Sequence, residues 1–233
     1  MVTASDVMPA RMDLVFALGS AAAGTAGLVL LFKEPLPAVI FMVLLLALCV
    51  ARWHTRADLA ALAVGLTLGN ATELLCDSRG LWIHFNRSVL GVAPAYILVC
   101  YAILWVCFPR LMDALLQRQR PPVQGVATAL LLWGGHVGLA WVVGSQNTPL
   151  LLLSAAFLAV TLWRFHDAHD LGAAGFGALL GMVWEIPATL SGAWIYPEPQ
   201  FLGLIPWWLP VAYGVFFVNL ARVTAWLATR GQS

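Results

Sequence analysis

The chain has 233 residues, of which 61% are apolar and only 10% are charged, and its mean hydropathy is +0.87. These values exclude an ordinary soluble domain and indicate an integral membrane protein. The net charge of +1, without a long basic run, excludes a surface that binds nucleic acid.

Hydropathy and breaker residues predict eight transmembrane helices, so the expected fold class is an all-α polytopic membrane protein. The first apolar run reaches spanning length, and we therefore expect a helix there rather than a cleaved signal peptide. The connecting segments are too short for a soluble domain. In chain order the predicted helices cover residues 12–32, 37–52, 58–78, 89–109, 124–144, 149–164, 170–190 and 204–227.

The sequence contains an internal repeat, in which Arg52 is aligned with Arg164. Residues 52–110 align with 164–222 without a gap and share 19 identities in 59 positions, including charged residues and tryptophans that membrane composition does not supply. We therefore predict two tandem four-helix repeats that together form one membrane domain. The repeats cover residues 1–116 and 125–233, and residues 117–124 link them. Because each repeat has an even number of helices, both should run in the same direction.

The basic residues predict how the chain is oriented, because short cytoplasmic loops carry an excess of Lys and Arg. With the N-terminus inside, nine basic residues fall on the inner side, and only Lys33, Arg79 and Arg87 fall on the outer side. We therefore expect a multi-pass protein of the cell membrane with both termini in the cytoplasm.

A short signature recurs at the predicted cytoplasmic side, R-W-H-x-x-x-D-L at Arg52 and R-F-H-x-x-x-D-L at Arg164. Cations suit the negative end of a helix dipole, and an aspartate suits the start of the next helix. The signature therefore predicts that Arg52 and Arg164 close one helix and that Asp58 and Asp170 are the N-caps of the following one.

Neither the cysteines nor the histidines predict a metal centre. The four cysteines lie in apolar runs without C-x-x-C spacing, so we expect small buried core residues. The second copy of the signature reads H-D-A-H-D and could hold a divalent metal, but Thr55 and Ala57 replace two of these ligands in the first copy. We predict no metal and no cofactor.

A stripe of small residues that ends in an acid occurs once in each repeat, with members every fourth residue. Such a stripe lines one face of a helix and lets a second helix approach closely. We therefore expect helices three and seven to pack on each other along the stripe and to diverge at the glutamates. The stripe comprises Ala61, Gly65, Gly69 and Glu73 in the first copy and Ala173, Gly177, Gly181 and Glu185 in the second.

Glu73 and Glu185 are the candidate catalytic residues, with Asp77 as a third. No Lys or Arg lies at the depth of either glutamate, and a carboxyl group inside a membrane must be protonated, paired or facing a cavity. We expect at least one to be a neutral acid at pH 7, able to donate a proton. Thr189 stands opposite Asp77 in the repeat, so the halves are chemically unequal. The alternative is that both glutamates only bond neighbouring donors and hold the fold.

Aromatic residues are concentrated after the two glutamates, in the sequences GLWIH and GAWIY that begin at Gly80 and Gly192. The glycines are expected to end the helices, and the tryptophans to lie at the outer interface. The rings predict an aromatic-walled cleft that stabilises a cation and shapes a pocket for a hydrophobic substrate. The candidate substrate-binding residues are Trp82, Tyr101, Trp184, Trp194, Tyr196, Trp208 and Tyr213.

This layout resembles the integral-membrane lycopene cyclases and the related carotenoid hydratases, which also place G-x-W-x-aromatic after a membrane-embedded acid, in two copies. The sequence M-V-W-E-I, Met182 to Ile186, resembles the tryptophan-glutamate motif of small integral-membrane terpene cyclases of meroterpenoid pathways. The paired glutamates that follow a proline in lycopene cyclases are absent after Pro94 and Pro206. The resemblance implies proton-initiated chemistry on a polyprenyl alkene or epoxide, without metal. By position, Glu185 matches the acid of the motif and Glu73 is its equivalent in the first repeat, and either glutamate could be the proton donor.

The sequence thus predicts a membrane-bound isoprenoid-modifying enzyme, a terpene- or carotenoid-type cyclase that acts on a hydrophobic isoprenoid or lipid substrate. Aspartate-rich motifs that bind Mg²⁺ and diphosphate are absent, which argues against prenyl transfer. One alternative is a small proton- or cation-coupled transporter or a lipid-binding membrane protein. Another is a scaffold without chemistry.

Overall fold

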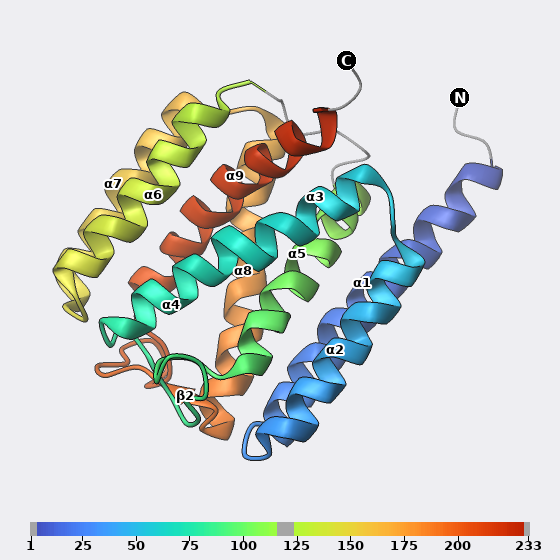
Figure 1. Cartoon of the computed structure of the whole chain (residues 1–233). Coiled ribbons are helices and arrows are strands. Elements are labelled where there is room, and N and C mark those ends of the chain that lie inside the picture. The colour runs from blue at the N-terminus through green and yellow to red at the C-terminus, as the bar shows by residue number, and fades with distance from the viewer. Residues whose placement is uncertain (1–3, 116–123, 231–233) are drawn as a thin grey trace.

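The structure is a computed structural model that describes residues 4–115 and 124–230, and it is helical apart from two very short strands (Figure 1). Of the predicted linker 117–124, residues 117–123 lie outside the described part. In chain order the elements are α1 (Ala4–Leu31), α2 (Pro35–Arg52), α3 (Arg56–Val64), the π-helix η1 (Gly65–Gly69), α4 (Asn70–Ser78), β1 (Ile83–His84), α5 (Ala95–Leu115), α6 (Val126–Val143), α7 (Asn147–Arg164), α8 (Ala168–Ser191), β2 (Trp194–Ile195) and α9 (Trp208–Thr229).

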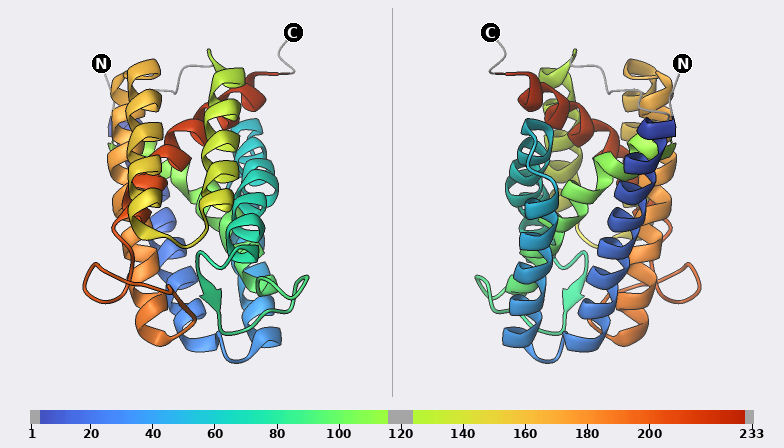
Figure 2. Two further views of the ribbon diagram at one scale, coloured as in Figure 1. Left: turned by 90° about the vertical axis from the view of Figure 1, so that its left-hand side faces the viewer. Right: turned by 90° about the vertical axis from the view of Figure 1, so that its right-hand side faces the viewer.

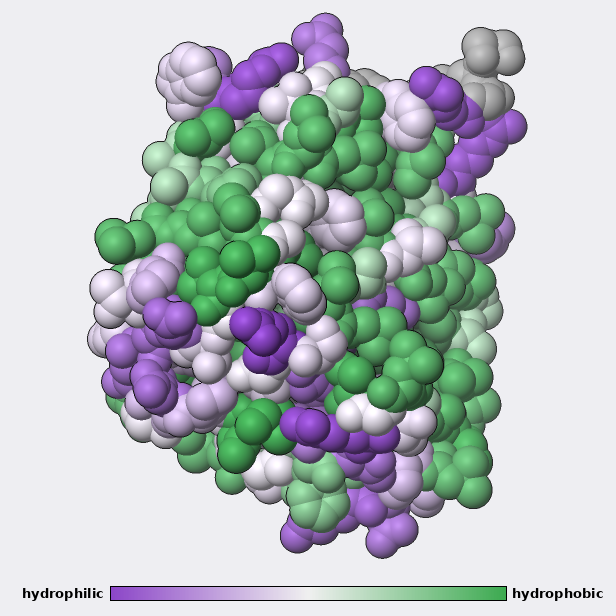
Figure 3. Space-filling model, turned by 60° about the vertical axis from the view of Figure 1, so that its left-hand side comes forward, coloured by the Kyte–Doolittle hydropathy of each residue, from purple (hydrophilic) through white to green (hydrophobic). Residues whose placement is uncertain are grey.

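Within the described residues, eight helical segments are long and apolar enough to cross a membrane, which confirms the predicted number. The third of them is continuous through α3, η1 and α4. Hydrophobic side chains cover most of the face in Figure 3, and hydrophilic ones gather towards its lower part and its upper end. The composition and this surface together indicate a multi-pass membrane protein.

Two predicted helix starts were wrong, because α5 and α9 begin later than residues 89 and 204. In each case a tight turn comes first, with a leucine at φ 53° (Leu90 and Leu202). A proline then precedes the helix, and a residue before proline disfavours helical geometry. Apolar composition alone does not distinguish such a turn from the first turn of a helix.

The helices form a four-part core with a helical hairpin on each side (Figures 1 and 2). The core consists of α3–η1–α4, α5, α8 and α9. The hairpin α1/α2 packs against α5, and the hairpin α6/α7 packs against α9. In α5 and α9, 67% of the residues of each span are buried, against 17% to 39% in the other spans. These two helices are therefore the centre of the fold.

The glycine stripes contact different helices from the predicted ones. A Cβ atom on Gly65 would lie 2.7 Å from the Tyr101 carbonyl oxygen of α5, and a Cβ atom on Gly177 would lie 2.5 Å from the Phe217 ring of α9. Each stripe thus packs on the core helix that follows it in the chain, and the expected crossing of helices three and seven at the glycines was wrong. The physical reason is the bulky aromatic residues of α5 and α9, which need a groove without side chains.

Several backbone features recur at positions that are aligned in the sequence repeat. The strands β1 and β2 pair antiparallel with Ile83 opposite Ile195, and the alignment matches these same two residues. The pairing ties the segment after α4 to the segment after α8 at the end of the molecule remote from the start of α1 (Figure 1). The isolated bridges are also at aligned positions, since one joins Val89 to Ala93 and the other joins Phe201 to Ile205.

At the opposite end, buried ion pairs join each stripe helix to its core helix. Asp58 of α3 accepts from Arg110 of α5 at 2.7 Å, and Asp170 of α8 accepts from Arg222 of α9 at 2.9 Å. The two aspartates are not the predicted N-caps, because Thr55 and Asp167 occupy those positions and each accepts a bond from the backbone N–H three residues on. The third position of the helix leaves the aspartate carboxylate free to reach the arginine.

Candidate functional site

The two glutamates lie in the interior, on helices that other contacts hold in place. Glu73 of α4 is 3% exposed and Glu185 of α8 is 6% exposed. Gly192 ends α8 in the left-handed conformation (φ 81°), and Gly80 adopts the same conformation (φ 75°) just after α4. Glycine takes this conformation without steric cost. Each turn directs the chain back across its own glutamate.

Glu73 is bonded by residues of the β1 region and of α5. The Trp82 indole N–H donates to Oε1 at 3.0 Å, and the Tyr101 hydroxyl donates to Oε2 at 2.8 Å. The His84 Nε2 atom lies 3.2 Å from Oε1. Both carboxyl oxygens therefore have partners, as a buried carboxyl group requires.

Glu185 has a matching set of partners. The Trp194 indole N–H and the Tyr196 hydroxyl donate to Oε2 at 2.7 and 2.8 Å, and the Tyr213 hydroxyl donates to Oε1 at 2.6 Å. Each partner is aligned with a partner of Glu73 in the sequence repeat. The single chemical difference is that Tyr196 replaces His84. The structure thus brings together both predicted acids and five of the predicted aromatic residues.

The difference at His84 creates a chain of titratable groups on the Glu73 side only. His84 Nδ1 lies 2.9 Å from Asp77 Oδ2, while Nε2 faces Glu73. Burial lowers the pKa of His84, but the nearby Glu73 and Asp77 carboxylates outweigh burial and raise that pKa above its ordinary value. An imidazolium can donate from both ring nitrogens, which matches the two acidic neighbours. His84 therefore bridges two carboxyl groups.

Glu73, Asp77 and His84 also form a cluster that could supply ligands to a divalent cation, because their nearest ligand atoms lie within 4.8 Å of one another. In this geometry one ring nitrogen of His84 bonds Asp77 and the other faces Glu73. Both ring nitrogens thus already have a carboxylate neighbour, and we assign no metal to the cluster.

Two cavities adjoin the glutamates. The smaller cavity is lined by both glutamates and by six of the predicted aromatic residues, so the expected aromatic-walled cleft is present. The larger cavity is lined by Glu185 but not by Glu73, and its wall includes Trp208. The residues that line both cavities are Trp82, Tyr101, Glu185 and Tyr213.

Four site residues differ from their expected surroundings or were missed. Trp82 and Trp194 were expected at the membrane interface, but they are 8% and 4% exposed and bond the glutamates instead. His84 was not among the candidates, although its alignment with Tyr196 in GLWIH and GAWIY could have identified it. Asp77 faces neither cavity directly and contacts the site through His84.

A second buried polar pair was also missed, in the wall of the larger cavity. His136 of α6 and Ser154 of α7 are 8% and 1% exposed, and His136 Nε2 lies 3.0 Å from Ser154 Oγ. Neither residue has a polar counterpart in the repeat, so the repeat gave no signal. The polar character of both residues inside apolar spans was the one available indication.

The fold and the site define a polytopic helical membrane protein with two buried carboxyl groups beside a cavity. No family profile and no curated protein matches the chain. The chain is similar to a solved structure, the crystal structure of a cross-linked trimer of a cysteine variant of MvINS. The TM-score is 0.61 and the identity 20%, and the match covers 76% of this chain and 97% of the other. At this identity the similarity shows a shared fold alone.

Proposed function

We propose that the protein is a membrane-bound isoprenoid-modifying enzyme of the terpene- or carotenoid-type cyclase class, in which a carboxylic acid protonates a polyprenyl alkene or epoxide. The observation that carries the proposal is the position of Glu185, which shares the aromatic cavity with Glu73 and also lines the larger apolar cavity. An acid that lines an apolar hollow can lie directly beside an alkene bound there, which is the geometry that proton transfer to a carbon atom requires.

In the proposed reaction Glu185 donates its proton to one alkene carbon or to the epoxide oxygen of the substrate. The π bond or the C–O bond breaks, and a carbocation forms on the neighbouring carbon. A second alkene of the same chain then attacks this cation and closes a ring. The rings of Trp82, Tyr101 and Tyr213, which line both cavities, present π-electron density that stabilises the cation as it moves.

The reaction ends when a base removes a proton next to the final cation and a new alkene forms. Glu73 is suited to this step because it faces the smaller cavity and is backed by His84 and Asp77. The proton taken up by Glu73 returns to Glu185 through the cavity that both carboxyl groups line, so both groups recover their starting state before the next turnover. The proton count over the cycle is zero, so this isomerase-type chemistry consumes no cofactor.

We also infer that the chain is a tandem duplication with both termini in the cytoplasm. The equivalent donors to the two glutamates and the ion pairs at Arg110 and Arg222 all recur at aligned positions of the repeat, which supports the duplication. Arg52 and Arg164 end α2 and α7 at the end of the molecule where α9 finishes, and the positive-inside rule favours that end as cytoplasmic.

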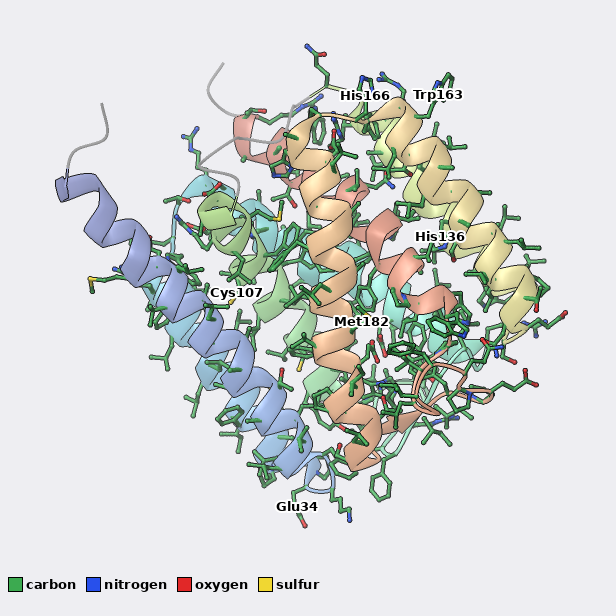
Figure 4. The ribbon with its side chains drawn as sticks, turned by 180° about the vertical axis from the view of Figure 1, so that it is seen from behind. Glu34, Cys107, His136, Trp163, His166 and Met182 are labelled. Carbon is green, nitrogen blue, oxygen red and sulfur yellow. The ribbon has the colours of Figure 1, made fainter. Side chains whose placement is uncertain are left out.

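The test compares Glu185→Gln and Glu73→Gln with wild-type protein in a host supplied with polyprenyl alkenes and epoxides. Glu34→Gln is the matched control, because Glu34 is an exposed carboxyl group at the turn between α1 and α2, remote from the cavities (Figure 4). Isoprenoids are extracted and profiled by mass spectrometry after folded protein is verified in the membranes. A new cyclic product is expected from wild type and Glu34→Gln and not from Glu185→Gln.

Identical isoprenoid profiles from the wild type and both site variants would refute the cyclase. If wild type binds the polyprenyl compounds without converting them, the alternative of a lipid-binding membrane protein replaces it. Uptake of protons or cations into vesicles that depends on Glu73 and Glu185 would favour the transporter.

A further inference from the structure

The larger cavity lies on the side of the molecule where Thr72 is found, and one pair of equivalent residues distinguishes this side from the other. Thr72 of α4 lines the cavity, and Trp184, which is aligned with it in the repeat, does not. Trp184 instead lies over α1, where a Cβ atom on Gly24 would meet its ring at 3.6 Å. The small threonine side chain leaves a space open between α4, α6 and α9. In the other half, the tryptophan ring fills the corresponding space beside α1.

The residue that faces this space on α6 is also changed. When the same alignment is extended without a gap, His136 matches Gly24. Gly24 therefore lies beside Trp184, whereas His136 lies on the side of Thr72. The His136 ring is held by Phe157, with ring centroids 5.4 Å apart, and by the Ser154 hydroxyl at 3.0 Å. Met42 stands in the place of Ser154 on the other side and is apolar. A polar pair has therefore been placed only where the cavity is open.

Burying this pair is costly because polar groups inside apolar membrane spans need partners, and both residues are among the 22% of residues that are buried in the spans of α6 and α7. The two side chains satisfy one hydrogen bond between them, and a hydroxyl group in the cavity can bond to both, because serine and imidazole each donate or accept. Among the residues that the structure describes, no Lys or Arg lines the cavity. The cavity therefore offers neutral polar partners and no charge that would bind a diphosphate.

From this asymmetry we infer that the larger cavity is a binding site for an isoprenoid lipid with one neutral oxygen function, a hydroxyl or a carbonyl. This oxygen bonds His136 and Ser154, and the apolar chain extends along Leu209 towards Glu185. Thr72 provides the room for the chain. The inference rests on the proposed function and deepens it by naming the substrate class, and it distinguishes an oxygenated isoprenoid from a pure hydrocarbon and from a prenyl diphosphate.

The experiment measures binding without turnover, in protein reconstituted in lipid nanodiscs. The probes are farnesol and the matched hydrocarbon that lacks its hydroxyl group, each titrated while the fluorescence of the cavity tryptophans is followed. Ser154→Ala removes one hydrogen bond to the probe, which should weaken farnesol binding by up to about tenfold and leave the hydrocarbon unchanged. Thr72→Trp should abolish the binding of both probes, and Thr72→Ser should retain it.

A second measurement needs no variant. Farnesol with a photoreactive diazirine beside its hydroxyl group should label peptides of α6 and α7 in the wild-type protein, in competition with unlabelled farnesol. Equal farnesol affinities for wild type and Ser154→Ala, or labelling confined to lipid-facing residues, would overturn the inference. These experiments measure binding and not turnover, so such a result would not refute a Glu185-dependent cyclase. Conversely, a Glu185→Gln variant that still forms product and binds farnesol normally would refute the cyclase and not the binding site.

Discussion

Replacing His84 by phenylalanine provides a quantitative test of the bridged carboxyl groups. The substitution removes two contacts to carboxyl oxygens, at 2.9 Å from Asp77 and at 3.2 Å from Glu73. Glu73 keeps its bonds from Trp82 and Tyr101, but Asp77, 4% exposed, loses its one side-chain partner at Oδ2, and its Oδ1 atom has none. Removing one member of a buried pair costs about 3 to 5 kcal/mol.

Stability is measured as the unfolding temperature and the denaturant midpoint in nanodiscs, followed by tryptophan fluorescence. The matched variant is the double substitution of Asp77 to Thr and His84 to Tyr, which copies Thr189 and Tyr196 of the second site. The double variant removes Asp77 together with His84, so no unpaired buried acid remains. Its free energy of unfolding should therefore fall by less than about 1.5 kcal/mol. The bridging role of His84 would be refuted by either of two results: a free energy of unfolding of His84→Phe within about 1 kcal/mol of the wild-type value, or a double variant that is less stable than His84→Phe.

The remaining predictions concern pH, the buried ion pairs and the glycine stripe. The pKa of His84 is raised above 6.5 because the carboxylates of Glu73, Asp77 and Glu185 outweigh the effect of burial. The stability that protonated His84 contributes should therefore be full below pH 6.5 and lost as the pH rises through the pKa of the folded state. Unfolding scans of wild type and His84→Gln should converge at alkaline pH. Asp170→Asn breaks a buried ion pair and should lower the free energy of unfolding by about 3 to 5 kcal/mol in the same scans. Asp13→Asn breaks an exposed pair and should lower it by less than about 1 kcal/mol. Equal losses in the two variants would contradict the role of burial. Gly181→Ala places a Cβ atom in steric overlap with the Tyr213 ring and should destabilise the protein by about 1 to 3 kcal/mol. An unchanged unfolding temperature would contradict the close packing of α8 on α9.

The spans and the two acids were predictable because their signals are local. Spanning length follows from the hydropathy of about 20 consecutive residues, and an acid such as Glu73 or Glu185 inside such a run is rare enough to be noticed on its own. The burial of all four cysteines was predictable for the same reason and is confirmed.

The partner of each glycine stripe was not predictable, since a stripe specifies a face and not the helix that covers it. Gly65 and Gly177 contact α5 and α9 because Tyr101 and Phe217 project towards them, and this depends on how those helices are rotated in the assembled core. The inward position of Trp194 likewise depends on the turn at Gly192 and on strand pairing with β1, which join residues far apart in sequence.

The differences between the two sites suggest a division of roles across a shared framework. The donors common to both sites, an indole and a tyrosine hydroxyl, position each carboxyl group in the same way. The residues that differ are grouped by function. His84 and Asp77 connect Glu73 to further titratable groups, while the open cavity adjoins Glu185, which lacks such a connection. A reaction that begins with proton donation and ends with proton removal needs two carboxyl groups in different surroundings, because identical acids would have the same proton affinity and no preferred direction of transfer. The asymmetry at His84, which lines the aromatic cavity, and at Thr72, which lines the larger one, supplies that difference.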